Sequence, residues 1–171
     1  MPVRNRRDGL IIVQDGTPGT PNEIVIAHEE GNLSWTETLN KVAVLDRGAL
    51  DSRRAGDEAP CKVSFASNHV ELCSDILDSG EAETPTAREV FHQIGNAAGW
   101  LSTAADGEAF AVRVIFWVLN PDSAGKDEKI VFEKVALDSL KFQEAAEANS
   151  LSFEAEDWET KPTITREDYA A

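Results

Sequence analysis

Closely spaced runs of alternating apolar and polar residues in the C-terminal half constrain the fold of this chain most strongly. In the first run the residues Phe110, Val112, Val114, Phe116 and Val118 share one side. Strict alternation sends successive side chains to opposite faces of a β-strand. The four runs span 109–119, 129–137, 139–144 and 150–158, with short connections. We therefore predict four strands of a large antiparallel sheet that has one buried face and one charged face.

The N-terminal third repeats this pattern in shorter pieces. Runs at 10–13, 23–28 and 33–39 are separated by glycine-containing turns, of which 15–22 also holds two prolines. Glycine permits positive φ and proline sets φ near −65°, so both favour tight turns. We expect a β-hairpin here, followed by a strand at 61–67 with Cys61, Val63 and Phe65 inward. The phase slips beyond Asn68, which indicates a bulge or turn.

One helix is predicted between the two sets of strands. Thr86 and Glu89 form a Thr-x-x-Glu capping box just after Pro85. Val90, Phe91, Ile94 and Ala98 then follow at helical spacing on one face. We expect a helix over about 86–98, ended by Gly95 or Gly99, that packs against the sheet.

The segment 46–59 is rich in charge and poor in apolar residues. Long segments without structure of their own are uncommon unless they are functional or linkers. Two readings remain open: a disordered surface loop, or a loop that docks on another charged surface. Its candidate contact residues are Arg47, Asp51, Arg53, Arg54, Asp57 and Glu58. Residues 159–171 are expected as an extended tail, because Pro162 argues against a central strand.

The net charge of −15 excludes several classes of partner. Binding to a DNA backbone requires Lys and Arg, and an anionic membrane surface also attracts basic segments. The charge indicates either solubility or a surface that repels a passing polyanion. No stretch approaches the roughly 20 apolar residues of a membrane span, and the N-terminus lacks a signal peptide. We therefore expect a cytoplasmic chain with Cys61 and Cys73 as reduced thiols.

The sequence nominates no catalytic or metal centre. His69, Glu71 and Cys73 share one face of a strand, but a zinc site usually adds a close ligand pair from a second segment. There is no Gly-x-Ser-x-Gly elbow and no phosphate-binding glycine loop. The four tryptophans suit core or subunit-interface positions. We expect no enzymatic activity, no cofactor and no bound metal.

The order of these elements resembles a known family. The resemblance rests on GNLSWTE (31–37), the charged loop DRGALDSRRAGDE (46–58), CKVSFAS (61–67), the mid-chain helix and the closing hairpin at 136–159 with its paired Leu-x-Phe motifs. Together they are similar to the major tail tube proteins of long-tailed, siphovirus-like bacteriophages. Tube proteins of type VI secretion systems share the fold of that family. The resemblance implies a mainly β fold: a β-sandwich or barrel of antiparallel strands with one flanking α-helix and a long charged loop. It makes 1–158 a single domain and 159–171 a C-terminal tail.

The same resemblance implies hexameric rings stacked into a hollow tube in the virion, assembled in the host cytoplasm. The implied partners are further copies of the chain, the tape measure protein inside the tube before ejection, the tail terminator, and baseplate or tip proteins at the ends. Genomic DNA would pass through without specific binding, and no membrane is involved. The charged loop would make inter-ring or inter-subunit contacts. The lumen would be faced by Lys141, Gln143, Glu154 and Glu156.

Three alternatives remain open from the sequence. The polar side chains of the closing hairpin would lie on the outer wall if the sheet faced the other way. The chain would be another phage tail or head–tail joining subunit, or a secretion-type tube protein, if the resemblance holds only at the level of the fold. A small β-sandwich binding module is the alternative from a different class.

Overall fold

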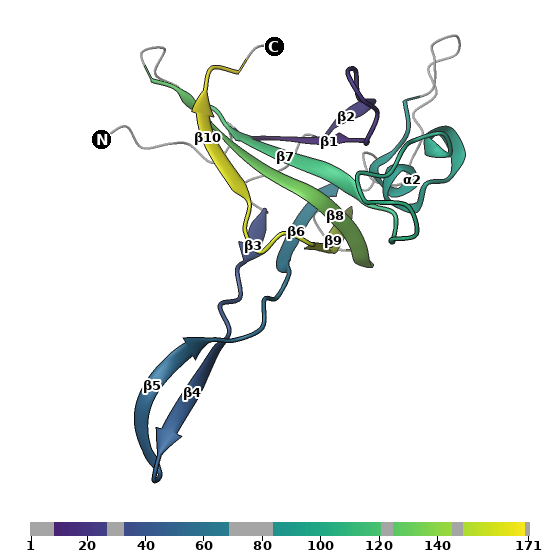
Figure 1. The fold of residues 1–171 in the computed structure, drawn as a ribbon. Helices are drawn as coiled ribbons and strands as arrows, with labels where there is room; N and C mark the ends of the chain where they lie inside the picture. Colours follow the sequence, from purple (N-terminus) through teal and green to yellow (C-terminus); the bar gives the residue numbers. More distant parts are fainter. Residues whose placement is uncertain (1–8, 27–32, 69–83, 121–124, 145–148, 170–171) are drawn as a thin grey trace.

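The computed structural model describes residues 9–26, 33–68, 84–120, 125–144 and 149–169. Within them, one antiparallel sheet runs in the order β2-β1-β7-β8-β9-β6-β3, and β10 also pairs with β8 (Figure 1). A separate two-stranded sheet, β4-β5, projects away from this body (Figure 1). The mainly β fold class expected from the sequence is confirmed. The body strands are β1 (Gly9–Gln14), β2 (Glu23–Ile26), β3 (Ser34–Thr36), β6 (Cys61–Asn68), β7 (Val112–Val118), β8 (Asp127–Glu144), β9 (Asn149–Asp157) and β10 (Thr163–Glu167).

Strand β8 is the longest strand and pairs with β7, β9 and β10. The two strands predicted at 129–137 and 139–144 are one continuous strand, and a register shift between Leu137 and Ser139 marks where its pattern slips against β9. The first part of β8 pairs with β7 and the last part with β9. Val135 lies opposite Val112 of β7 on one side and opposite Asp157 of β9 on the other, so the two halves of the sheet meet at this residue.

The chain returns along β8 almost to its start. In β9, Phe153 lies opposite Leu140, which confirms the closing hairpin predicted from the sequence. After a break at 158–162, β10 continues along the same strand, with Ile164 opposite Ile130. The expected extended tail at 159–171 is therefore wrong in part, because five of its residues form a strand. Pro162 directly precedes that strand, where it removes no hydrogen bond from the ladder.

The main core lies on one face of the sheet. It gathers side chains from both ends of the strand order, such as the buried Ile24 of β2 and the partly buried Trp35 of β3, so the sheet curves around this core. Phe132 of β8 is fully buried at its centre, and the Trp35 ring meets it edge-on at 6.0 Å between centroids. The predicted inward set Cys61, Val63 and Phe65 is confirmed.

The opposite face of β7 carries a second, smaller apolar cluster. Ile12, Ile115, Trp117 and Val131 are buried there. The Tyr169 ring covers Trp117 at 5.2 Å between centroids, and the Tyr169 amide donates to Asp127 Oδ2 at 2.8 Å. The end of the described chain therefore shields the face of β7 that bears Ile115 and Trp117.

The predicted helix is real but shorter than expected. The capping box of Thr86 and Glu89 is present, and α2 spans Ala87–His92. Gln93 then takes the left-handed conformation at φ 53°, and a 3-10 turn, η2 (Gly95–Ala97), follows. The helix thus ends before either expected glycine. As a result Ile94 is 41% exposed, whereas Val90 and Phe91 are buried as predicted.

The opening hairpin is held by a buried carboxylate. β1 pairs with β2 as expected, but β3 pairs with β6 at the opposite end of the strand order. In the β1–β2 turn, Asp15 is 1% exposed and accepts five hydrogen bonds, from the backbone and side chains of Thr17 and Asn22 and from the Leu101 amide. Burial raises the pKa of Asp15, but the bonds from Thr17 and Asn22 outweigh it, so the pKa is lowered.

The neighbouring glycine is required by close packing. A Cβ on Gly16 would lie 2.2 Å from the Ser102 carbonyl oxygen. The Gly16 amide donates to the Leu101 carbonyl oxygen at 2.8 Å. The β1–β2 turn is therefore hydrogen-bonded to the loop after η2 and packed directly against it. A side chain in place of Gly16 would push the turn and the loop apart.

Candidate assembly surfaces

The segment expected as a charged loop at 46–59 is mostly a β-hairpin, so that expectation is wrong. β4 (Lys41–Asp46) pairs with β5 (Ala49–Ala55), and Figure 1 shows this hairpin, residues 41–55, projecting from the body as an arm. Arg47 and Gly48 form its turn with φ of 48° and 85°. Two successive positive φ values match the turn that best fits the twist of a hairpin. The missed signal was the alternation in KVAVLD followed by Arg-Gly.

The arm exposes apolar side chains that the described part of the body leaves uncovered. Val42 is 55% exposed, Leu45 61% and Leu50 53%, and none of the buried core residues belongs to the arm. Leu39, just before β4, is 76% exposed. An isolated two-stranded hairpin is at best marginally stable in water, and contiguous exposed apolar surface marks interaction sites. This surface points to a binding partner.

The arm also differs in charge from the remainder of the chain. It holds four basic and two acidic residues, a net charge of +2, so the other residues carry −17 of the total of −15. Its basic side chains are Lys41, Arg47, Arg53 and Arg54, and in the described part of the chain none of them makes an ion pair. Four cations are thus available to an acidic surface.

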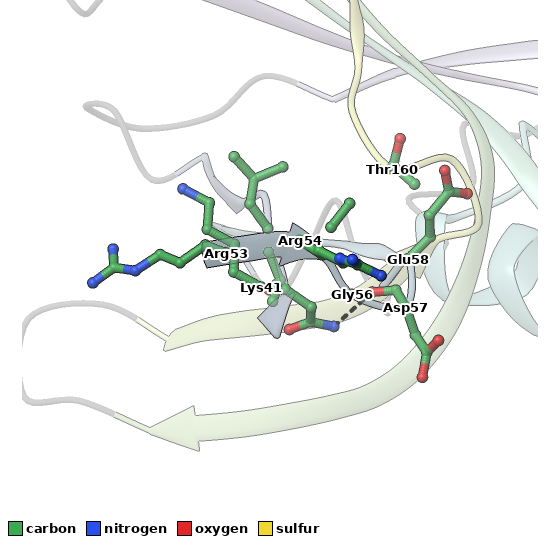
Figure 2. Close-up of a pocket in the computed structure, with 11 residues that line it drawn as sticks. Lys41, Arg53, Arg54, Gly56, Asp57, Glu58 and Thr160 are labelled. Carbon is green, nitrogen blue, oxygen red and sulfur yellow. Dashed lines mark hydrogen bonds between the residues drawn. The ribbon is translucent and has the colours of Figure 1, made fainter. Parts of the chain in front are cut away.

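A pocket of about 510 Å³ lies where the arm joins the body (Figure 2). Lys41, Arg53 and Arg54 line it from the arm, and Thr160 lines it from the break between β9 and β10. The junction is fixed by backbone and side-chain bonds of Asn40: its carbonyl oxygen accepts from the Gly56 amide at 2.9 Å, and its Nδ2 donates to the Asp57 carbonyl oxygen at 2.8 Å. The hairpin ladder therefore continues one step past the arm into the body.

The structure splits the six candidate contact residues into two groups. Arg53, Arg54, Asp57 and Glu58 gather around the pocket at the base of the arm. Arg47 sits in the turn, and Asp51 is the extra residue where the β5 register shifts. The sequence therefore identified charged residues of the arm and of its base but missed the apolar residues of the arm.

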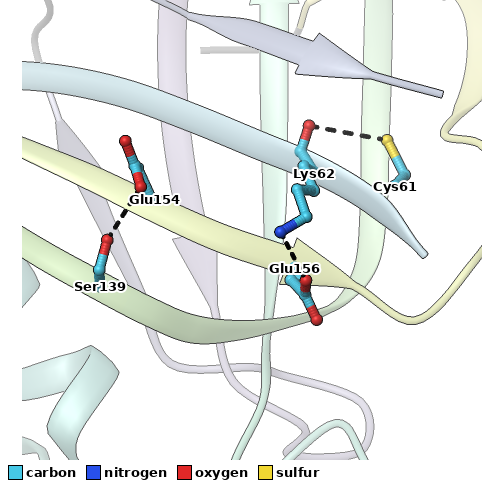
Figure 3. Close-up of polar contacts among 5 residues, drawn as sticks. All are labelled: Cys61, Lys62, Ser139, Glu154 and Glu156. Atoms are coloured by element: carbon cyan, nitrogen blue, oxygen red, sulfur yellow. Dashed lines mark hydrogen bonds and ion pairs between the residues drawn. The ribbon is translucent and has the colours of Figure 1, made fainter. Parts of the chain in front are cut away.

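Two of the candidate lumen residues, Glu154 and Glu156, make polar contacts with neighbouring strands (Figure 3). Ser139 donates to Glu154 at 3.1 Å, and Lys62 Nζ lies 2.9 Å from Glu156 Oε1. The hydrogen bond and the charge of Glu156 both raise the pKa of Lys62. Lys141 is exposed. By register Gln143 lies opposite Ser150, and its side chain lies outside the described residues.

The polar face that bears Glu154 continues onto β6 and β3. Ser64 lies opposite Glu154 in the ladder, and its hydroxyl is 2.8 Å from that of Ser34. A shallow hollow of about 250 Å³ opens here, lined among others by Asp138 and Lys62. The face is a mixed, acid-rich surface whose charges are partly paired with one another.

A buried thiol and a buried carboxylate lie next to each other in the ladder at the end of β9. Cys61 faces Asp157, and both are fully buried. Burial, together with the charges of Asp157 and Glu37, raises the pKa of Cys61 to about 11, so the thiol is unreactive at neutral pH. Burial also raises the pKa of Asp157, whose Oδ2 has no hydrogen-bond partner in the described structure. Their position in the packed sheet suits a structural role.

The histidine-containing pattern at 69–73 lies outside the described residues. Among the residues that are described, no three His, Cys, Asp or Glu side chains come together as a metal-binding group. No helix in the same described ranges has the length and apolar character needed to cross a membrane.

Comparison with known proteins finds a likeness among solved structures. No family model and no curated protein matches the chain. Among solved structures, a chain from the cryo-EM structure of the anti-feeding prophage (AFP) baseplate, 6-fold symmetrised, is similar over 98% of this chain and 97% of that chain. The sequence identity is 10% and the TM-score is 0.49. At that level of similarity, the functional interpretation has to rest on the surfaces described above.

Proposed function

We propose that this chain is a structural subunit of a phage tail tube, in which hexameric rings stack and conduct DNA during ejection. The observation that carries the proposal is the arm: a hairpin that holds no core residue, exposes Val42, Leu45 and Leu50, and bears cations that form no ion pair with any described residue. Such a hairpin gains stability only when a partner covers it. In a repeating assembly, that partner is a neighbouring subunit.

The edges of the body sheet support the same proposal. β2 and β3 end the strand order, and β10 lies off it beside β8. All three strands are short, and Ile164 of β10 is 51% exposed. Unpaired edges invite further pairing, and closing strands from several subunits into one barrel removes them. A net charge of −15 suits a wall past which DNA slides without binding. The order of elements in the sequence resembles tail tube proteins in the same way.

The arm can be removed without cutting the body. Replacing residues 43–53 by Asn-Gly joins Val42 to Arg54, which already face each other across the hairpin. The variant should keep the thermal unfolding midpoint of the body and fail to form rings or tubes in negative-stain images, whereas the wild-type chain forms them. Tubes of normal appearance from the variant, or a wild-type chain that stays monomeric at its highest soluble concentration, would overturn the proposal.

The polar face of β9 is proposed to face the lumen. Glu154→Lys with Glu156→Lys should leave assembly intact and make the tubes retain DNA in co-sedimentation, with retention decreasing as salt rises. The matched control is Asp106→Lys with Glu108→Lys, an equal change of charge at two exposed loop residues. Equal DNA retention by both variants would assign the effect to net charge and place Glu154 and Glu156 on the outer wall.

The pocket at the base of the arm favours a second candidate, a small binding module. Its volume of about 510 Å³ and its three basic side chains, which outnumber the acidic side chains of Asp57 and Glu58, suit an acidic ligand. A monodisperse monomer whose unfolding temperature rises with an added dicarboxylate or phosphate compound would support this candidate. Another phage tail or head–tail joining subunit, or a secretion-type tube subunit, would give rings that do not extend into tubes, or tubes that do not carry DNA.

A further inference from the structure

We infer that the arm is buried on both of its faces, inserted between two neighbouring copies of the chain. This inference rests on the proposed function and adds the geometry of the contact. It follows from the distribution of side chains between the two faces of the β4–β5 ribbon.

The strand register assigns each arm residue to a face. Residues directly opposite each other in an antiparallel pair share a face, and neighbours along a strand alternate. Leu45 lies opposite Leu50, and Ala43 lies opposite Arg53, so these four residues share the first face. On the second face, Val42 lies opposite Arg54 and Val44 opposite Ser52. The register shift adds Asp51 to β5 and leaves the alternation along β4 unbroken.

Both faces therefore carry the same combination of side chains. The first face exposes Leu45 at 61% and Leu50 at 53%, together with the exposed Arg53. The second exposes Val42 at 55%, together with the exposed Arg54. A ribbon that lies flat on one partner would keep its outward face polar, as antiparallel sheets with one solvated face do. Apolar residues on both faces indicate that both are covered.

The occupant of each face is argued from charge. The arm carries +2 and the remainder of the chain −17, so a second copy offers an acidic surface to either face. By register Arg53 and Arg54 lie on opposite faces of the ribbon, although both also line the pocket at its base, and neither is ion-paired within the described residues. A hairpin inserted between two copies would place one arginine against each of them. An arginine suits such a contact because its planar fork of donors matches a carboxylate.

Matched substitutions on the two faces test the inference. Val42→Asp and Leu50→Asp each introduce one negative charge, at residues of nearly equal exposure, 55% and 53%. A carboxylate buried in an apolar contact is costly, so each should raise the protein concentration at half-maximal assembly by more than about tenfold. Leu101→Asp is the control, because Leu101 is 51% exposed and lies on the body outside the arm. Assembly is measured by sedimentation and by negative-stain imaging.

A second pair of variants separates loss of contact from loss of the hairpin. Val42→Thr and Leu50→Thr keep a residue with high strand propensity and remove only apolar contact. Each should raise the half-maximal concentration roughly twofold to fivefold, in the same order as the aspartates. Since threonine leaves the hairpin formed, a shift seen with both threonine variants cannot come from unfolding of the arm.

The outcomes distinguish this inference from the proposed function. Impaired assembly with substitutions on both faces supports insertion between two copies. Impairment on one face alone means that the arm lies flat on a single copy, which overturns the inference and keeps the proposed function. Normal assembly with all four variants overturns the proposed function as well. Assembly could also require a different protein and be impaired by substitutions on both faces. That protein, and not a second copy, would then be the occupant, and the inference would be overturned.

Discussion

The body and the arm are built from the same alternating pattern, yet only the body satisfies it internally. On β7, Val114 packs into the main core and Ile115 into the cluster beneath Tyr169, so both faces of the strand are covered. On β4, Val42 and Leu45 point to opposite faces and both stay exposed. The difference teaches that alternation specifies a strand but leaves open what covers it. In the arm, under the function proposed above, the cover comes from another molecule.

Core truncation sharpens this comparison with the largest expected effect. Phe132→Ala removes a fully buried ring from the centre of the body and should reduce the free energy of unfolding by about 3–5 kcal/mol. Leu45→Ala in the arm removes an apolar side chain that is 61% exposed and should change it by less than about 0.5 kcal/mol. Urea titrations of both variants under non-assembling conditions give the two values. A cost above about 2 kcal/mol for Leu45→Ala would mean that the arm folds onto the body.

The anchoring of the turns gives the next largest effect. Asp15→Asn keeps the shape of the side chain but puts an NH₂ group where an oxygen accepts from Thr17, Asn22 and Leu101. The substitution should reduce the free energy of unfolding by about 1–3 kcal/mol at neutral pH, because buried donors in the β1–β2 turn are left unpaired. The arm turn has no such anchor, so Arg47→Ala should leave the unfolding free energy unchanged.

The pH dependence of the stability difference between wild type and Asp15→Asn tests the direction of the Asp15 pKa shift. The pKa of Asp15 is lowered in the folded protein. Its contribution is therefore complete above the ordinary carboxylate pKa, and it is lost as pH falls through the folded pKa. The difference in unfolding temperature between wild type and Asp15→Asn should be constant near neutrality and shrink in acid. A gap that widens on acidification would contradict the assignment.

The smallest expected effect concerns charge on the arm. Arg53→Glu with Arg54→Glu should raise the concentration at half-maximal assembly by roughly threefold to tenfold at low salt and less at high salt, since exposed ion pairs are weak and screened. Arg88→Glu with Lys161→Glu makes the same charge change at exposed residues of the body and serves as control. If light scattering shows equal effects for both variants at every salt concentration, the arm arginines have no specific acidic partner.

Much of the body could be predicted from its local pattern. The alternation at Val63 and Phe65, the capping box at Thr86 and the closing hairpin all agree with the structure, because each depends on neighbours in sequence. The helix end was missed because Gln93, without a glycine, takes a left-handed conformation that the local sequence does not signal. The arm was missed because charge at Arg53 and Arg54 outweighed the short alternation of β4 in the reading of the segment.

By itself the sequence determined which residues alternate, where turns occur and how the charge divides between the arm and the remainder of the chain. Those properties depend on side-chain size, backbone preference and ionisation, which are local. Only the tertiary structure decided that β3 pairs with β6 instead of the opening hairpin, that β10 continues the ladder on β8, and that Val42 and Leu50 stay exposed among the described residues. Strand pairing and burial depend on which distant segments meet, and the period of two is the same for every strand in the sheet.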